Sequence, residues 1–331
     1  MRLCLLWREF DSHGPHGEIM GATPYNPLLA PILVTGTHRS GTTWIGKMLA
    51  TDPSTAYISE PLNVWHRPGV FRAQVKHWYQ YICEENESEY LPAFTELLEF
   101  DYHFWKEMRS IRSLKDFLRM GRDFRTFYYG LEQGRRALIK DPFAVFSAAW
   151  FARQINFKVV IAVRHPLAFV GSLKRLNWPF DLQDLLDQPL LMRDHLEPFR
   201  SQMESAKSQD VIGQSALLWT LIYRVVHADR ELNPDLMIVH HEDLSRDPVN
   251  GFRGLYAFLG LDYTSHVQKI ILNSSGSENP KELSRNKKHA VKLDSRANVD
   301  NWKKRLSDEE VKRVRKITEE VSQLYYPDAN W

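Results

Sequence analysis

The chain has 331 residues, 43% of them apolar, which is enough to build a sizeable hydrophobic core in one α/β domain. Its 43 Lys and Arg against 41 Asp and Glu give a net charge of +2, without the strong basic excess of proteins that bind nucleic acid broadly. The apolar run at the N-terminus stops at Trp7, and no segment approaches the roughly 20 apolar residues of a membrane span. We therefore expect a cytoplasmic protein with no membrane span. The sparse cysteines, Cys4 and Cys83, fit a reducing compartment.

Short apolar runs rich in β-branched residues alternate with segments of helical periodicity. This alternation predicts an α/β fold in three layers, with a central parallel sheet flanked by helices. The run KVVIAV at 158–163 is almost continuously apolar, as expected for an interior strand. The predicted strands are 31–35, 55–59, 137–139, 158–163 and 236–240, and the predicted helices are 42–50, 144–155, 167–175, 190–208, 211–232 and 307–325. Ser307 and Glu310 predict a capping box at the start of the last helix.

The domain organisation follows from these elements. Residues 31–331 are predicted to form a single domain after an irregular segment at 1–30. A region rich in aromatic and charged residues, at about 69–135, is predicted to be a helical insertion over the sheet. A polar, basic stretch at about 273–300 is predicted to be a long loop that is mobile without ligand.

The turn between the first strand and the first helix, GTHRSG, runs from Gly36 to Gly41 and has the Gly-x4-Gly spacing of a phosphate-binding loop. Glycines let the backbone approach an anion, and a helix N-terminus offers free N–H groups and a positive dipole end. Thr42 stands where a P-loop nucleoside triphosphatase has Lys, which handicaps triphosphate and Mg²⁺ chemistry. Arg39 can supply the cation for a single 5′-phosphate linkage. The predicted fold is therefore P-loop-like, with an ordinary strand–turn–helix corner as the alternative.

The segment THRSGTTW at 37–44 resembles the 5′-phosphosulfate loop of PAPS-dependent sulfotransferases, PAPS being 3′-phosphoadenosine 5′-phosphosulfate. It is most similar to the carbohydrate, tyrosylprotein and bacterial branches, since the cytosolic small-phenol branch usually has Lys in place of Arg39. The resemblance implies that Trp44 lies beside the adenine, although a core position is the alternative. It also implies donor contacts from the loop residues Arg39, Ser40, Gly41, Thr42 and Thr43.

A second anion site is predicted at the end of the strand 158–163. Arg164 follows this strand, and Ser172 comes eight residues later on the predicted helix. Ligands bind at the carboxyl edge of open α/β sheets, so both side chains can face one anion. The 3′-phosphate motif of the family has the same form, and the resemblance implies that Arg164 and Ser172 hold the 3′-phosphate. A surface Arg and an unrelated helical Ser are the alternative.

Glu60, in SEPLN, and Lys140, in IKDPF, also follow predicted strands. A carboxylate at a strand end can take the proton of an attacking hydroxyl, and Arg39 and Lys140 can stabilise the transferring sulfuryl group. Glu-Pro-Leu resembles the carbohydrate branch and Lys-Asp-Pro-Phe the tyrosylprotein branch, in which a Glu is the base and the Lys assists. We therefore predict Glu60 as the catalytic base, with Arg39 and Lys140 assisting. A salt-bridging Glu60 and a solvated Lys140 are the alternatives, and Asp141 is interpreted as a turn residue.

Further contacts are predicted less specifically. Lys292, ten residues before Trp302, resembles a donor-contacting Lys of the tyrosylprotein branch, and a solvated basic stretch is the alternative. His241 and Glu242 stand where the family often has Tyr-Glu, which puts an aromatic contact there in doubt. Either an acceptor cleft or a packed insertion explains the aromatic and basic residues Trp65, His66, Arg67, Trp78, Trp105, Arg109 and Arg112.

Together these motifs predict an enzyme, a PAPS-dependent sulfotransferase that moves a sulfuryl group to an acceptor hydroxyl and releases PAP without a metal. The acceptor is a glycan, a small molecule or a peptide, with carbohydrate the first candidate, and no nucleic-acid partner is expected. One alternative is a P-loop nucleotide kinase, which the missing P-loop Lys disfavours. Another is a non-catalytic nucleotide- or glycan-binding module, which Glu60 disfavours. The sequence carries no readable code for the acceptor or the oligomeric state.

Overall fold

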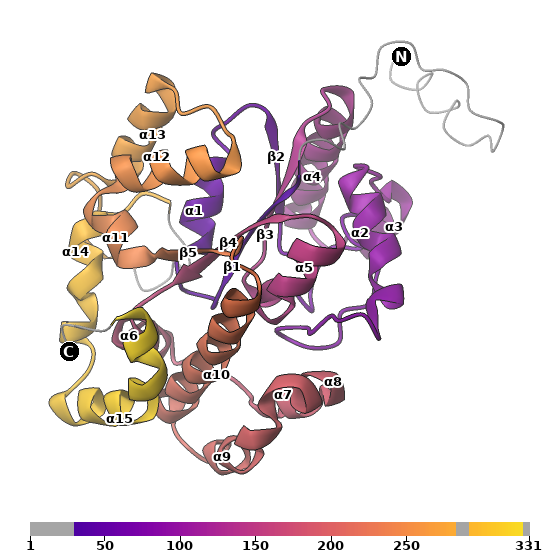
Figure 1. Cartoon of the computed structure of the whole chain (residues 1–331). Helices are drawn as coiled ribbons and strands as arrows, with labels where there is room; N and C mark the ends of the chain where they lie inside the picture. The colour runs from indigo at the N-terminus through magenta and orange to yellow at the C-terminus, as the bar shows by residue number, and fades with distance from the viewer. Residues whose placement is uncertain (1–29, 283–290, 327–331) are drawn as a thin grey trace.

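The computed structural model describes residues 30–282 and 291–326, and within them a single parallel sheet of five strands has the order β2-β3-β1-β4-β5 (Figure 1). The α/β class and the central parallel sheet predicted from the sequence are thus confirmed. The strands, in chain order, are β1 (Ile32–Gly36), β2 (Thr55–Ser59), β3 (Arg136–Lys140), β4 (Lys158–Val163) and β5 (Met237–His240). Apart from Ala30, the irregular segment predicted at 1–30 lies outside the described residues.

The helices flank this sheet on both faces. They are α1 (Thr42–Leu49), α2 (Leu91–Leu98), α3 (Phe104–Ser110), α4 (Leu114–Glu132), α5 (Ala148–Gln154), α6 (Pro166–Leu176), α7 (Gln183–Leu186), α8 (Pro189–Leu191), α9 (Arg200–Ala206), α10 (Val211–Leu232), α11 (His241–Arg246), α12 (Pro248–Leu259), α13 (Ser265–Ser275), α14 (Ser295–Val299) and α15 (Asp308–Tyr325). The predicted capping box is confirmed at α15, where Ser307 and Glu310 cap each other's backbone N–H groups. None of the helices in the described ranges combines the length and apolar character needed to cross a bilayer.

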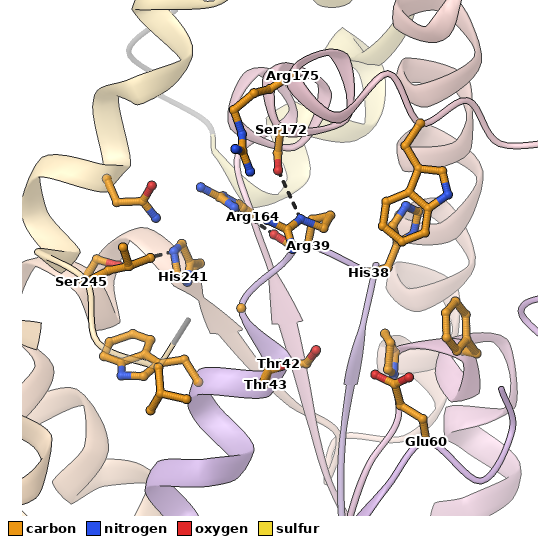
Figure 2. Close-up of a pocket in the computed structure, with 18 of the residues that line it drawn as sticks. His38, Arg39, Thr42, Thr43, Glu60, Arg164, Ser172, Arg175, His241 and Ser245 are labelled. Atoms are coloured by element: carbon orange, nitrogen blue, oxygen red, sulfur yellow. Dashed lines mark hydrogen bonds between the residues drawn. The ribbon is translucent and has the colours of Figure 1, made fainter. Parts of the chain in front are cut away.

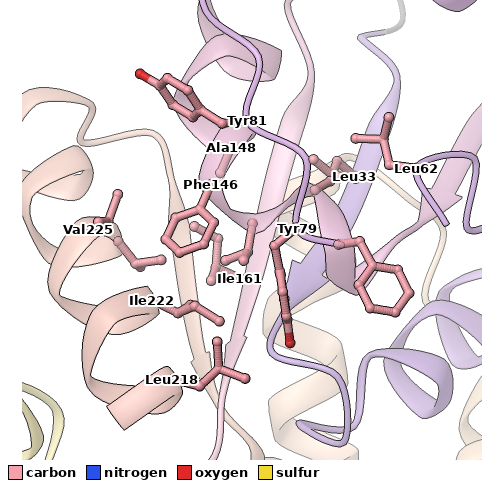
Figure 3. Packing of buried hydrophobic residues seen from close by; sticks show 14 of the residues in the cluster. Leu33, Leu62, Tyr79, Tyr81, Phe146, Ala148, Ile161, Leu218, Ile222 and Val225 are labelled. Atoms are coloured by element: carbon pink, nitrogen blue, oxygen red, sulfur yellow. The ribbon is translucent and has the colours of Figure 1, made fainter. Parts of the chain in front are cut away.

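Alternate strand residues face opposite layers, as the pleat of a strand requires. Leu33 and Ile161 point into one cluster, in which Leu218 and Ile222 of α10 pack against them (Figure 3). Ile32, Val34 and Val160 point into the other cluster, which Trp44 of α1 and Phe252 of α12 complete. Because both faces of the sheet are buried, the three-layer arrangement follows directly from the apolar strands.

The register aligns the carboxyl ends of the strands. Ser59 of β2 lies beside Lys140 of β3, Gly36 of β1 beside Ala162 of β4, and Val163 of β4 beside His240 of β5. The segments that follow these strands therefore emerge along one edge. β1 is the central strand, between β3 and β4. From β1 the chain passes to β2 in one half of the sheet, and from β4 it passes to β5 in the other half. Because these connections diverge, a crevice opens at this edge.

The insertion predicted at about 69–135 contains α2, α3 and α4, whereas residues 69–86 are irregular. This irregular stretch binds side chains of other segments instead of forming internal helical hydrogen bonds. The bonds are Trp78 N to Asp184 Oδ2 (2.6 Å), Tyr81 N to Gln188 Oε1 (2.9 Å) and Ile82 N to Ser147 Oγ (2.9 Å). They fix the stretch beside the carboxyl edge of the sheet.

Two other segments depart from the predicted elements. The single helix predicted at 190–208 is interrupted, because Pro198 has no N–H to donate and clashes with the preceding turn. The loop predicted at about 273–300 is shorter at both ends, since α13 continues to Ser275 and Asp294 caps α14. Residues 283–290, which hold the basic residues Arg285, Lys287 and Lys288 of this predicted loop, lie outside the described residues.

Gly36, the last residue of β1, should not tolerate a side chain. Its φ is +139°, and an added Cβ would lie 2.3 Å from the carbonyl oxygen of Ala162. We expect Gly36→Ala to lower the free energy of unfolding by roughly 3 kcal/mol, from backbone strain and overpacking. In contrast, Gly254→Ala in α12 places its Cβ in open space and should stabilise by about 0.5–1 kcal/mol. Urea denaturation of both variants tests this, and equal effects would contradict the strain at Gly36.

Candidate active site

A cavity of about 250 Å³ opens at the carboxyl edge of the sheet (Figure 2). Every strand contributes to it through the residues that follow its end, and this edge is where open α/β sheets bind ligands. These contributions are Arg39 after β1, Glu60 after β2, Pro142 after β3, Arg164 after β4 and His241 after β5. In Figure 2, Thr42 and Thr43 lie between His241 on one side and Glu60 on the other.

The turn after β1 forms as its glycine spacing predicts. Arg39 and Gly41 both have positive φ, +69° and +96°, and α1 begins directly after them. Thr42 and Thr43, in the first turn of α1, line the cavity, where helix N–H groups have no partner within the helix. The N–H (3.1 Å) and the hydroxyl (2.6 Å) of Ser40 both donate to the carbonyl of Thr37, and its donor contact stays a prediction. The buried Ser40 side chain therefore stabilises the turn.

The two predicted anion motifs are in direct contact. Nε of Arg39 donates to Oγ of Ser172 at 3.2 Å, and Nη1 of Arg164 donates to the carbonyl oxygen of Arg39 at 2.8 Å. Trp219 in α10 fixes the end of β4 by donating its Nε1 to the carbonyl of Arg164 at 2.8 Å. The sequence separates these motifs by more than a hundred residues. The parallel pairing of β1 with β4 brings them together.

Four arginines converge on this side of the cavity: Arg39, Arg164, Arg175 and Arg305. Burial, and next the positive charges of its three neighbours, lower the pKa of Arg39 to about 10. Burial likewise lowers the pKa values of Arg164 and Arg175. Nε of Arg164 and Nε of Arg175 are buried without a hydrogen-bond partner in the described part of the chain. Buried like charges with unused donors are costly alone, so this cluster is suited to an anionic ligand.

Sequence reasoning missed Arg175 and Arg305. Arg175 lies three residues after Ser172 on the same helix, so helical spacing was a usable signal for it. Arg305 belongs to a distant segment and pairs with Glu282, and no local pattern pointed to it. Lys292, which was predicted to contact the donor, is exposed, whereas its neighbours Val291 and Leu293 line the cavity.

Glu60 and Lys140 form an ion pair at the ends of β2 and β3. The Lys140 side chain is only 3% exposed, whereas that of Glu60 is 26% exposed and lines the cavity. Asn63 donates to the second carboxylate oxygen of Glu60 at 2.9 Å, and the backbone of Glu60 has a φ of +55°. Lys140 thus lies behind Glu60 and acts on the cavity through it, which argues against the solvated-Lys alternative.

Asp141 is a turn residue, as interpreted from the sequence. Its carboxylate accepts from the N–H of Leu62 at 2.6 Å and from the N–H of Phe143 at 2.9 Å, which fixes the segment after Glu60 to the end of β3. Burial, and next the negative charge of Glu60, raise the pKa of Asp141 to about 7. This carboxyl is therefore sensitive to pH near neutrality.

The raised pKa of Asp141 predicts a pH-dependent stability. A carboxyl whose pKa is higher in the folded than in the unfolded protein contributes stability that is present below about pH 4 and lost as the pH rises through about 7. Asp141→Asn lacks this titrating group and serves as the reference. Relative to this variant, we expect the wild type to lose on the order of 3 kcal/mol of unfolding free energy between about pH 4 and pH 7. Urea denaturation across the pH range measures it. A difference that stays constant with pH would contradict the raised pKa.

Trp44 and His241 form the wall opposite Glu60. Trp44 lines the cavity but is held from behind, since its Nε1 donates to Oγ of Ser274 at 3.0 Å and its ring meets Phe252 edge-on at 5.1 Å. Because His241 stands where the family often has Tyr, an aromatic contact here was in doubt. The imidazole ring of His241 lines this wall, and its centroid lies 6.0 Å from that of the Trp44 ring. Burial holds the pKa of His241 well below its usual range. Its Nδ1 is buried with no hydrogen-bond partner among residues 30–282 and 291–326.

Aromatic side chains surround the Glu60 side of the cavity. Trp65 meets Trp78 edge-on at 5.1 Å between centroids, and Trp78 lies 4.6 Å from Phe143. Trp65 is 80% exposed, so its ring is available to a ligand. Trp178, which sequence reasoning missed, also lines this cavity. The other predicted cleft residues have different places: Arg67 pairs with Glu107, His66 meets Phe71 edge-on, and Trp105, Arg109 and Arg112 are exposed on or just after α3.

Two curated proteins are similar to parts of this chain. Carbohydrate sulfotransferase 1 of Danio rerio is 30% identical over 95 residues, which are 28% of this chain and 22% of the fish protein. Carbohydrate sulfotransferase 4 of Mus musculus is 24% identical over 119 residues, which are 36% of this chain and 29% of the mouse protein. The matched regions thus span less than a third of each relative.

Two solved structures align with most of the chain. The sulfotransferase domain from the curacin biosynthetic pathway has a TM-score of 0.45 at 15% identity, covering 92% of this chain and 99% of that domain. A mouse sulfotransferase complexed with PAP has a TM-score of 0.44 at 12% identity, covering 91% of this chain and 85% of that protein. The profile of the sulfotransferase family matches residues 31–265, which is most of the chain. This protein therefore belongs to the sulfotransferase family.

Proposed function

We propose that this sulfotransferase takes the sulfuryl group from PAPS, transfers it to a hydroxyl of an acceptor and releases PAP. The observation that carries the proposal is the contact between the turn after β1 and the end of β4, which gathers Arg39, Arg164, Ser172 and Arg175 around one cavity. An adenosine bisphosphate carries two anionic groups, and this arrangement offers a place for each. A ligand with that charge would neutralise the clustered arginines.

The two anionic groups of the donor have distinct places in this proposal. The 5′-phosphosulfate binds at the N-terminus of α1, where Thr42 and Thr43 line the cavity and the helix dipole favours negative charge. The 3′-phosphate binds Arg164 and Ser172, with Arg175 beside them. Arg39, whose Nε contacts Ser172, lies between the two groups. Trp44 and His241 then flank the adenosine.

Catalysis in this proposal is an in-line displacement. The acceptor hydroxyl lies beside Glu60, which takes its proton as the hydroxyl oxygen bonds to sulfur. The bond between sulfur and the bridging oxygen of the 5′-phosphate breaks, and PAP leaves with the electron pair. Arg39 and the N–H groups of α1 stabilise the charge on the transferring group and the leaving phosphate. Lys140 orients Glu60 from behind.

Thermal unfolding with different ligands tests the donor. PAP should raise the Tm in the presence of a chelator, because its binding requires no metal in this proposal. ATP with Mg²⁺ should have little effect, whereas a nucleotide kinase would show the reverse, and a glycan-binding module would respond to glycan alone. No shift with PAP at saturating concentration would contradict the proposal. The chelator tests the independence from metal, and the cytoplasmic location stays a prediction that this ligand series does not address.

The acceptor that we propose is a carbohydrate. Sugars stack their apolar faces on aromatic rings, and Trp65, Trp78 and Phe143 present such rings next to Glu60. The two relatives are named carbohydrate sulfotransferases, which agrees with this choice. A screen of glycans, alcohols and tyrosyl peptides with labelled PAPS identifies the acceptor. Transfer only to tyrosyl peptides would contradict it.

Trp65 should determine acceptor binding and not donor binding. We expect Trp65→Ala to raise the KM for the acceptor by roughly tenfold, because the exposed ring supplies about one stacking contact. The KM for PAPS should stay unchanged. The matched control is Leu232→Ala, which removes another exposed apolar side chain at the end of α10. An unchanged acceptor KM in the Trp65 variant would remove this residue from the acceptor site.

A further inference from the structure

The outer surface of α3 and α4 exposes an unusual concentration of large apolar side chains. Of the thirteen large hydrophobic residues that are exposed in the described ranges, eight lie between residues 105 and 131. They are Trp105, Met108, Leu114, Phe117, Leu118, Phe124, Tyr128 and Leu131, and Leu114 and Leu118 are 76% and 66% exposed. A concentration of exposed apolar side chains of this kind is typical of an interaction site.

The apolar residues of α4 form a single stripe. Leu114, Phe117, Phe124, Tyr128 and Leu131 recur at spacings of three, seven, four and three residues, which places them along one side of the helix, with Leu118 one turn after Leu114. An adjoining stripe, with Met120 and Phe127, is buried against the rest of the protein. The exposed stripe is therefore additional to the face that the helix needs for folding. Ring contacts of Phe104 with Trp105 (5.6 Å) and with Phe124 (5.8 Å) join α3 to it.

This surface is also strongly basic. Residues 105–131 contain seven Lys and Arg against three Asp and Glu, a net charge of +4, whereas the whole chain has +2. One of the three acids, Glu107, is buried and paired with Arg67. The basic residues, all exposed, are Lys106, Arg109, Arg112, Lys115, Arg119, Arg122 and Arg125. In the described part of the chain, Lys106, Arg109, Arg112 and Lys115 make no ion pair.

We propose that these eight apolar and seven basic residues form a docking face for an anionic lipid bilayer. Helices that lie on membranes combine an apolar stripe with Lys and Arg beside it and place Trp, Phe and Leu at the headgroup boundary. The positive charge is complementary to anionic headgroups. The same charge disfavours pairing with a second copy, because an isologous interface would bring two positive faces together.

A hydrogen-bond network joins the docking face to the acceptor side of the cavity. Arg67 pairs with Glu107 of α3 and donates to the carbonyl of Asp116 in α4 at 3.1 Å. Glu107 also accepts from the N–H of Gly69 at 2.8 Å. Arg67 lies two residues after Trp65, so the segment that carries Trp65 is attached to α3 and α4. A bilayer-bound enzyme would hold this side of the cavity at a fixed distance from the lipid.

Co-sedimentation of the full chain with vesicles tests the docking face. We expect binding to vesicles of phosphatidylcholine with phosphatidylserine, weak binding to phosphatidylcholine alone, and loss of binding at high salt. The double variant Leu114→Ser, Leu118→Ser should lower the partition coefficient roughly tenfold or more. The double variant Arg109→Glu, Arg112→Glu should lower the partition coefficient by roughly fivefold or more for each Arg replaced. The control Leu232→Ser, whose side chain is 78% exposed elsewhere, should bind as the wild type does.

The substituted side chains are exposed, so each variant should keep the wild-type Tm, which shows that a loss of binding is not a loss of folding. Failure of the wild-type protein to bind either kind of vesicle would overturn the proposal. So would a wild-type dimer in sedimentation velocity that the Leu114, Leu118 variant converts to monomer, since the face would then belong to a second copy. Vesicle binding requires neither PAPS nor an acceptor, and its outcome is therefore independent of the proposed reaction.

Discussion

Glu60→Gln should lower kcat by roughly 10²- to 10⁴-fold and leave the affinity for PAP almost unchanged. The amide has the shape of the carboxylate and can still accept a hydrogen bond from Lys140, but it cannot take the proton of the acceptor hydroxyl. In Figure 2, Glu60 lies away from Arg39, Arg164 and Arg175, so donor binding should not depend on its charge. The effect belongs to the chemical step, which single-turnover transfer of labelled sulfate from PAPS measures directly.

The choice of glutamine matters because Glu60 neutralises a buried lysine. In Glu60→Ala the ammonium of Lys140, with a side chain only 3% exposed, loses its carboxylate partner, which adds a structural cost to the catalytic one. The matched control is Glu309→Gln, an exposed Glu in the first turn of α15. Full turnover by Glu60→Gln would show that the base lies elsewhere and that its ion pair with Lys140 is structural.

Arg164→Ala should weaken PAP binding by roughly 100-fold, the effect of losing a charge-assisted contact to phosphate. Arg164 is buried and its Nε has no hydrogen-bond partner among the residues that the structure describes, so this group is available to a ligand in the cavity. The substitution also removes the hydrogen bond from Nη1 to the carbonyl of Arg39, which should lower the Tm of the unliganded protein. Arg164→Lys keeps the charge but not the planar guanidinium, so its affinity for PAP should lie between those of the wild type and Arg164→Ala.

A comparison of two nucleotides separates the 3′-phosphate contact from a general loss of charge. PAP carries a 3′-phosphate and AMP lacks it, so Arg164→Ala should weaken PAP binding strongly and AMP binding only slightly. Isothermal titration calorimetry of both ligands with both proteins gives the coupling free energy. Equal losses for PAP and AMP would contradict the assignment of Arg164 to the 3′-phosphate. Arg200→Ala, at an exposed Arg that begins α9, serves as the control.

The sequence by itself determined the five strands in their order along the chain and the position of the turn between β1 and α1, whereas it did not predict α11, α12 and α13. The strands predicted at 55–59 and 158–163 and the helix predicted at 211–232 coincide with β2, β4 and α10. Periodicity and β-branched content are properties of neighbouring residues, so they can be interpreted without knowledge of the fold. The turn from Gly36 to Gly41 was predictable for the same reason, because its backbone angles restrict which residues can occupy it.

Only the tertiary structure decided how distant side chains share the site. Arg305 and Arg39 line the same cavity, Lys140 forms an ion pair with Glu60, and the Ser40 hydroxyl donates to a carbonyl of its own turn. The irregular stretch at 69–86 also had no local signal, since side chains of later segments supply its hydrogen bonds. Local patterns specify which backbone conformation a segment prefers. The direction and partner of a side chain depend on which remote segments pack against it, and that information enters only when the sheet assembles.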